Sequence, residues 1–284
     1  MVSSVRVPEI LERLSHRLPS SVPRQSRFLL PLLTATTLGH GPRFLPPCLS
    51  VALNGLPRSP NPVPPEPIDP TIDEQLHPRR FAVRLVKESL VKSAVLVGVP
   101  KAIETLLELG RVVDEADRST AFVRSDLDRG EASWRERQRS GRRGLETVYQ
   151  GDIDGIFDMM RTGGLDDVRF FSESITYGTF LTPFQREPVA TGRSDSPRAF
   201  RSSDPFTTHP RLLSLVTLSC LVPQNTPREI LWHLRGALRR GWTRDEVEAV
   251  QTGVEMVCEE LGAKVEKGMP RVADVDVQKE ERQR

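Results

Sequence analysis

The sequence predicts an all-α fold, and three observations carry that prediction. Apolar residues recur at spacings of three and four along most of the chain, which is the period of a helix with one buried face. Helix start signals built from Thr, Pro and Glu, and stop signals built from Gly, separate these stretches. No alternation of apolar and polar residues is long enough to indicate a β-strand. We therefore expect antiparallel helix pairs that bury a shared apolar stripe.

Residues 1–56 are predicted as an N-terminal helical segment with three short helices. The first runs from Pro8 to Arg17, the second through residues 28–36, and the third follows Pro42. A Pro-rich linker is predicted over residues 57–78, because half of the residues between Pro57 and Pro70 are proline, which neither a helix nor a central strand accepts.

Residues 79–265 are predicted as the main helical domain, which opens with a pair of helices. The first helix has an apolar stripe that stops at Gly98, and the second begins at Pro100, a favourable first-turn residue, and ends at Gly110. Its apolar stripe is Ile103, Leu106 and Leu107. In the first helix we interpret Lys87, Glu88 and Lys92 as a solvated, ion-paired face.

Two charged or mobile insertions and a tail are predicted around the remaining helices. Residues 111–146 are crowded with charge, residues 187–209 are polar, and residues 266–284 are expected to be a disordered tail. Between them, residues 147–185 have helical spacing, and a buried helix over 212–222 precedes two further helices. Thr226 with Glu229, and Thr243 with Glu246, each match the capping-box pattern of a helix start.

Composition narrows the classes of partner. The chain has 284 residues, 37% hydrophobic and 27% charged, and 40 Lys and Arg against 38 Asp and Glu give a net charge of +2. This balance of charge predicts that nucleic acid is not a partner. The chain has no apolar run long enough to cross a membrane, so a membrane partner is not expected either. We expect a cytoplasmic protein; the mitochondrion is the alternative, since residues 1–27 are rich in Ser and Arg but contain Glu9 and Glu12.

The stretch WHLRGALRRGWTRDEVEAV, residues 232–250, resembles the carboxymuconolactone decarboxylase and AhpD-like superfamily, and more specifically its divergent fungal members. The matching positions are His233, Ala237-Leu238, Gly241-Trp242-Thr243 and Glu246-Val247. Residues 87–106, 173–183 and 214–221 resemble other helices of that family. The resemblance implies an AhpD-like helical fold for residues 79–265, and an assembly of several copies, hence a homo-oligomer.

The same resemblance directs attention to three side chains. The CxxC pair of the peroxidase branch is missing, because its positions hold Thr226 and Glu229, so the decarboxylase branch is favoured. That implies a cofactor-independent decarboxylase or proton-transfer enzyme acting on a small unsaturated or oxo acid, with His233 as the acid/base. Glu229 lies one turn earlier and could orient the imidazole, although its capping position already explains it. Tyr177 could hold a carboxylate or an enolate, although a core aromatic is the simpler interpretation.

Two alternatives remain open. One is an AhpD-like peroxidase that works through a single thiol, Cys220 or Cys258, although both cysteines look like small core residues. The other is a non-catalytic helical assembly module. No metal or cofactor site is predicted, because the three cysteines are far apart and form no Cys/His cluster.

Overall fold

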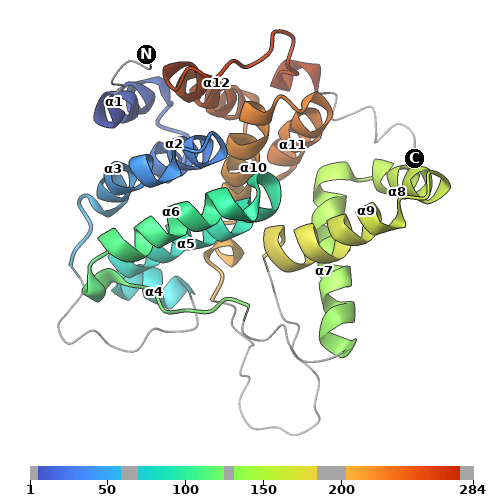
Figure 1. Cartoon of the computed structure of the whole chain (residues 1–284), viewed down its shortest axis with the longest axis horizontal. Helices are drawn as coiled ribbons and strands as arrows, with labels where there is room; N and C mark the ends of the chain where they lie inside the picture. Colours follow the sequence, from blue (N-terminus) through green and yellow to red (C-terminus); the bar gives the residue numbers. More distant parts are fainter. Residues whose placement is uncertain (1–5, 59–69, 125–130, 184–202, 276–284) are drawn as a thin grey trace, which may run out of the picture.

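The computed structural model describes residues 6–58, 70–124, 131–183 and 203–275, and every regular element in those ranges is helical (Figure 1), which confirms the predicted all-α fold. The α-helices are α1 (Val7–Arg17), α2 (Ser26–Thr37), α3 (Gly41–Leu53), α4 (Pro70–Leu76), α5 (Pro78–Val97), α6 (Val99–Val112), α7 (Glu131–Tyr149), α8 (Asp152–Thr162), α9 (Asp166–Phe170), α10 (Leu213–Leu221), α11 (Pro227–Arg239) and α12 (Arg244–Glu260). A π-helix, η2 (Phe171–Leu181), continues α9, and short 3-10 turns are η1 (Glu115–Asp117), η3 (Pro205–Thr207), η4 (Pro210–Leu212), η5 (Val222–Gln224) and η6 (Val272–Asp274).

Helix α2 lies at the centre of the bundle. All of its residues except Arg27 are buried, as expected for a helix that is apolar around most of its circumference. It packs against α3, α5, α10 and α12, so the N-terminal helices and the C-terminal helices share one continuous hydrophobic core. The Pro-rich stretch therefore separates two parts of the sequence without separating two cores.

Helices α5 and α6 form an adjacent pair that turns at Gly98, where a φ of +93° suits glycine. The predicted apolar stripe of the second helix is wrong at two of its three positions, since Ile103 is 45% exposed and Leu107 66% exposed. The buried face of α6 instead carries small residues where it meets α3. A Cβ atom on Gly41 would lie 2.0 Å from Thr105 Oγ1, so the two helices approach too closely for larger side chains.

The predicted solvated face of α5 is wrong for Glu88 and Lys92, which are buried, whereas Lys87 is partly exposed and donates to the carbonyls of Ser119 and Ala121. Arg80, Arg84, Glu88 and Lys92, spaced four residues apart, are each 2% exposed or less, and we call them the α5 charged stripe. Asp73 of α4 accepts hydrogen bonds from both arginines. Arg124 pairs with Glu88, and Asp204 pairs with Lys92. The stripe thus fastens three connecting segments to one helix.

Parts of the predicted linker, insertions and tail are helical or buried in the structure. Helix α4 occupies part of the linker, whose residues 59–69 lie outside the described residues, and α7 occupies part of the 111–146 insertion, of which 125–130 lie outside. In the 187–209 insertion, residues 184–202 lie outside the described part, but Phe206 is fully buried beside Asp204. In the tail, Val272 and Val275 are buried and only 276–284 lie outside.

Helices α7, α8 and α9 with η2 form a lobe, residues 131–183, at one side of the bundle (Figure 1). Glycines let α7 and η2 touch backbone to backbone. A Cβ atom on Gly141 would lie 1.9 Å from the carbonyl oxygen of Glu173, and one on Gly178 would lie 2.6 Å from that of Arg137. The lobe meets the bundle where η2 packs against α5 and where α7, together with Tyr177 of η2, packs against α11. We call the contact with α11 the seam.

Candidate functional site

His233 lies at the seam. Helix α11 buries Ile230, Leu234 and Ala237 at helical spacing, and His233 shares that face, so its side chain turns inward and is 3% exposed. Its Nε2 atom lies 3.4 Å from the hydroxyl oxygen of Tyr177. The structure therefore brings together two of the three residues that the sequence singles out, although they are 56 positions apart.

Tyr177 is held by the π-helix η2. The amide of Thr182 donates to the carbonyl of Tyr177, and the Thr179 hydroxyl donates to the carbonyl of Ser174, both five residues back. A π-helix is rare and is often found at functional sites. In this protein the π-helix η2 lies in direct backbone contact with α7, and Gly141 and Gly178 permit that contact. The buried Tyr177 ring faces α11 as a result.

Tyr149, at the end of α7, links Tyr177 to Glu229. Its hydroxyl donates to Glu229 Oε2 at 3.3 Å, and its ring packs edge to face against the Tyr177 ring, with the two ring centres 6.4 Å apart. Glu229 is only half-buried, whereas the other three side chains are buried. Together Glu229, Tyr149, Tyr177 and His233 form what we call the tyrosine–histidine array, which leads from the surface to the buried imidazole.

The array explains why one predicted capping box is wrong. The Thr226 side chain makes no cap bond to α11, and its hydroxyl donates to the carbonyl of Leu221 instead. The Glu229 carboxylate turns to Tyr149. The second box is confirmed, since Thr243 and Glu246 exchange both bonds at the start of α12. Glu229 thus has its polar contact in the array rather than at the helix terminus.

Burial shifts each member of the array towards its neutral form. Loss of hydration lowers the pKa of His233 to about 3, and the nearby Arg240 guanidinium acts in the same direction. Burial also raises the pKa of both tyrosines and of Glu229. The same loss of hydration lowers the pKa of Arg240. At neutral pH the imidazole is therefore uncharged, beside a cation.

Tyr149 and Arg240 are the members of the site that the sequence analysis misses. One compositional signal points to the first: the chain has two tyrosines among its 284 residues, and both lie in the array. Arg240 follows Arg239 at the end of α11, a position that the favourable interaction of cations with helix carboxyl ends already explains. Sequence alone cannot show that its side chain turns back towards His233.

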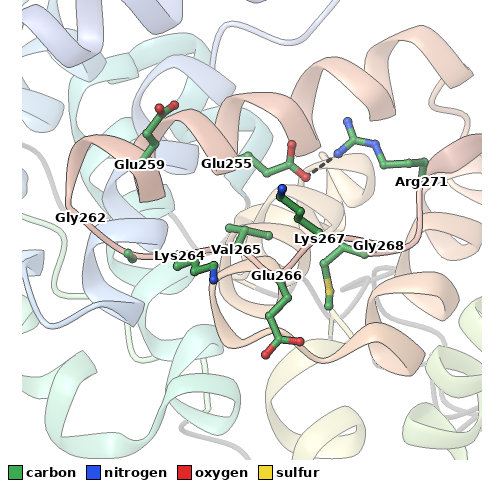
Figure 2. Close-up of a pocket in the computed structure, with 11 residues that line it drawn as sticks. Glu255, Glu259, Gly262, Lys264, Val265, Glu266, Lys267, Gly268 and Arg271 are labelled. Atoms are coloured by element: carbon green, nitrogen blue, oxygen red, sulfur yellow. Dashed lines mark hydrogen bonds and ion pairs between the residues drawn. The ribbon is translucent and has the colours of Figure 1, made fainter.

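A second hollow lies elsewhere on the molecule. An open groove with a volume of about 580 Å³ lies between the end of α12 and residues 262–271. Figure 2 shows the residues that line it. Both signs of charge line it, and Arg271 forms an ion pair with Glu255 across it. Asn225 fixes the returning segment through the carbonyl of Lys264 and the amide of Glu266. None of the predicted site residues lines this groove, so we keep the candidate site at the seam.

Cysteine chemistry receives no support from the structure. Cys48, Cys220 and Cys258 are all buried and unpaired, as expected for core residues. Burial raises the pKa of Cys220 and of Cys258 to about 12, and raises that of Cys48 further, which disfavours the reactive thiolate. Among the described residues, no group of three or more His, Cys, Asp or Glu side chains could hold a metal ion.

The fold and the site define an all-helical protein with a buried tyrosine–histidine array between a bundle and a lateral lobe. Over 179 residues, which are 62% of this chain and 70% of the relative, the chain is 25% identical to Peroxisomal protein 2 of Schizosaccharomyces pombe. No family model matches the chain, and no solved structure matches it. The chain is thus similar to a fungal protein, while the superfamily resemblance stays a prediction. In the parts of the chain that the structure describes, no helix is both long and apolar enough to span a bilayer.

Proposed function

We propose that this protein is a cofactor-independent enzyme, a divergent member of the carboxymuconolactone decarboxylase-like group, that decarboxylates or moves a proton on a small unsaturated or oxo acid. The observation that supports the proposal is the array itself. Glu229, Tyr177 and His233, the three side chains to which the family resemblance directs attention, lie in one series of contacts that runs through Tyr149 and ends at a buried imidazole. A buried acid/base with a polar connection to the surface is what a proton-transfer site needs.

In the proposed reaction the bond between the substrate carbon and its carboxylate breaks and carbon dioxide leaves. The electron pair stays on the carbon, delocalised into the neighbouring unsaturated or oxo group, and the carbon then takes a proton. His233 with the Tyr177 hydroxyl at its Nε2 supplies that proton. Tyr149 and the half-buried Glu229 return a proton from solvent. The 3.3 and 3.4 Å separations are long for hydrogen bonds and are expected to shorten once substrate is bound.

The test is turnover in matched variants. Each variant is incubated with a panel of unsaturated and oxo acids in D₂O, and carbon dioxide release and deuterium incorporation are measured. We expect His233→Asn to lower kcat by about 10²–10⁴, the usual contribution of a general acid/base. His16, which is exposed on α1, is the control, and His16→Asn should leave kcat unchanged. Full turnover in folded His233→Asn would remove the mechanism.

A peroxidase reaction through one thiol is the second enzymatic candidate. It is weaker because the three thiols are buried and their pKa values raised. Peroxide consumption by the protein and by its Cys220→Ser and Cys258→Ser variants separates the two candidates. Loss of consumption in either variant would favour the thiol, and equal rates in all three proteins would dismiss it.

We also propose that copies of the chain associate, as the family resemblance implies. Four large apolar side chains close together in sequence are 45–50% exposed, which is unusual: Leu165 just before α9, Val168 and Phe170 on α9, and Phe171 at the start of η2. Light scattering after gel filtration gives the mass of the wild type and of Val168→Glu. An oligomer without turnover on any acid would favour the non-catalytic assembly module.

For localisation, we propose the peroxisome beside the cytoplasm and the mitochondrion. The support is the name of the fission-yeast relative, which describes that protein as peroxisomal. A fluorescent fusion of the full chain, imaged in fungal cells with peroxisomal and mitochondrial markers, discriminates the three compartments. Diffuse fluorescence would favour the cytoplasm.

A further inference from the structure

Arg240 has an unusual environment for a guanidinium. It follows the last residue of α11, and its side chain lies back over Gly236, where an added Cβ atom would be 3.3 Å from Nη1. The residue as a whole is partly exposed, but Nη1 is cut off from solvent and has no hydrogen-bond partner among the described residues. A buried donor without an acceptor is costly, so such donors are normally paired.

A second buried polar atom without a partner, after Arg240 Nη1, belongs to the ring of His233. Its Nε2 faces Tyr177, while its Nδ1 is buried and has no partner within the described residues. The charge of Arg240 is close enough to disfavour protonation of this ring. Two buried polar atoms, one of them on a cation, are therefore left unsatisfied in the same region.

The neighbouring arginines of α11 are different. Arg239 donates to the carbonyl of Val148 at 2.6 Å, and Arg235 lies 3.2 Å from the Asp152 carboxylate. Both are used to attach the lobe to the bundle. Arg240 has no such carboxylate or carbonyl within the described residues, although it is in the same helix and next to the same lobe. An acceptor that is not part of the described chain would complete its environment.

We propose that Arg240 binds the carboxylate of a small organic acid at the seam, and that the bound anion brings a proton to His233. The identity of the acid as a substrate rests on the proposed function, but the binding site does not. A guanidinium matches a carboxylate with two parallel hydrogen bonds. The ligand must be small, because Val148, Gly236 and Tyr177 already surround the guanidinium and the imidazole.

The coupling to a proton follows from the charges that face His233. Arg240 is the nearby cation, Tyr177 of η2 and Tyr149 of α7 are neutral, and Glu229 lies at the far end of the array. A bound carboxylate offsets the guanidinium charge and adds a negative charge beside the ring. Both changes favour the protonated form of the His233 ring, so binding of the anion is accompanied by uptake of a proton. An organic acid that binds in its ionised form therefore lies beside a protonated His233 that can act as the acid.

The experiment is calorimetric titration of the full chain at pH 5.5 in two buffers of different ionisation enthalpy. Acetate and malonate are the carboxylate probes, and inorganic phosphate tests whether any small anion suffices. We expect malonate to bind with uptake of part of a proton, and Arg240→Gln to weaken binding at least tenfold and abolish the uptake. The control is Arg228→Gln, which removes the same charge from an exposed position on α11 and should leave both unchanged.

Further variants cover the remaining outcomes. If Arg240→Gln does not fold, Arg240→Lys serves, with weaker binding but retained proton uptake. In the wild type, nitrogen NMR of labelled histidine rings should show His233 protonating at a higher pH when malonate is present. Absence of binding, equal affinity in Arg240→Gln, or binding without uptake would each overturn the proposal. Proton-coupled binding without turnover on any acid would leave it standing and remove only the proposed reaction.

Discussion

The α5 charged stripe and the tyrosine–histidine array are both buried, but they differ in how closely their polar groups are paired. In the stripe each charged side chain has an oppositely charged partner close by: 2.6 Å for Arg80, 2.7 Å for Arg84 and Lys92, and 2.8 Å for Glu88. In the array the separations are 3.3 and 3.4 Å, and the adjacent Arg240 has an unpaired nitrogen. Each charge of the first region has an oppositely charged partner in the protein, whereas among the described residues no carboxylate forms an ion pair with Arg240.

This difference separates structural polar groups from functional ones. Burying two charges costs several kcal/mol of hydration, which only close, well-oriented pairing recovers. The stripe meets that condition and holds α4 and residues 124 and 204 on α5. The array leaves part of the cost uncompensated, which is the arrangement expected of a site that a ligand completes. The following predictions test this comparison, beginning with the largest effect.

The largest effect should come from Asp73→Asn in the stripe. One buried carboxylate accepts hydrogen bonds from Arg80 and from Arg84, so its neutralisation leaves two buried guanidinium groups without their counter-charge. We expect the free energy of unfolding in urea to fall by about 3–5 kcal/mol. Asp154, which pairs with Arg142 at the surface, is the control, and Asp154→Asn should cost below about 1 kcal/mol. Equal losses would show that the stripe is no more structural than a surface pair.

The second prediction concerns the backbone contact that accompanies the π-helix. Gly141→Ala would place a methyl group 1.9 Å from the Glu173 carbonyl oxygen, so α7 and η2 must separate. We expect a loss of about 2–3 kcal/mol in the free energy of unfolding, together with lower turnover, since Tyr177 moves with η2. Gly155→Ala in α8 meets no atom within 4 Å and should instead stabilise the protein by about 0.5–1 kcal/mol.

Much of the fold follows from sequence because helix periodicity and stop signals are local. The C-terminal helices and the Thr243–Glu246 cap are confirmed at the residues expected. The α5 charged stripe could not be predicted, since charges four residues apart on a helix look the same on an exposed face as on a buried one. Their partners, Asp73, Arg124 and Asp204, are distant in sequence, so only the tertiary structure decides between the two.

The candidate site also has residues that the sequence reveals and residues that it does not. His233 and Tyr177 were found through a family resemblance, and the local pattern at Thr226 led to the wrong role for Glu229. A capping box requires a side-chain choice that a competing hydrogen bond can change, and here the Tyr149 hydroxyl is that competitor. The sequence does not single out Arg240, because its place beside His233 depends on a close approach of its side chain over Gly236, which no spacing in the sequence reveals.

The third prediction uses the pH dependence of stability. The pKa of His233 falls from an ordinary value of about 6.5 to about 3 on folding, so below pH 6.5 the unfolded chain binds more protons. The stabilisation is therefore fully present above pH 6.5 and decreases as the pH falls towards 3. Between pH 7.5 and pH 5 the wild type should lose about 2 kcal/mol from this residue, and His233→Gln should lose that part of the slope.

Urea unfolding at both pH values measures this slope, and exposed His16 provides the matched control. His16→Gln loses no group that is dehydrated on folding, so its slope should equal that of the wild type. A wild-type slope retained by His233→Gln would mean that the ring is hydrated in solution. The array would then resemble an ordinary surface cluster, and the contrast with the α5 charged stripe would disappear.

The smallest change in stability, and the sharpest separation of stability from function, is expected for Tyr149→Phe. The ring packing against Trp232 and Tyr177 is kept, and only the hydroxyl that donates to Glu229 is lost, so the free energy of unfolding should fall by about 0.5–1.5 kcal/mol. If the array conducts protons, kcat should fall while KM for the acid stays constant, and Glu229→Gln should lower kcat alike. If the array only packs the seam, both variants keep the wild-type kcat, because nothing in the contact between His233 and Tyr177 has changed.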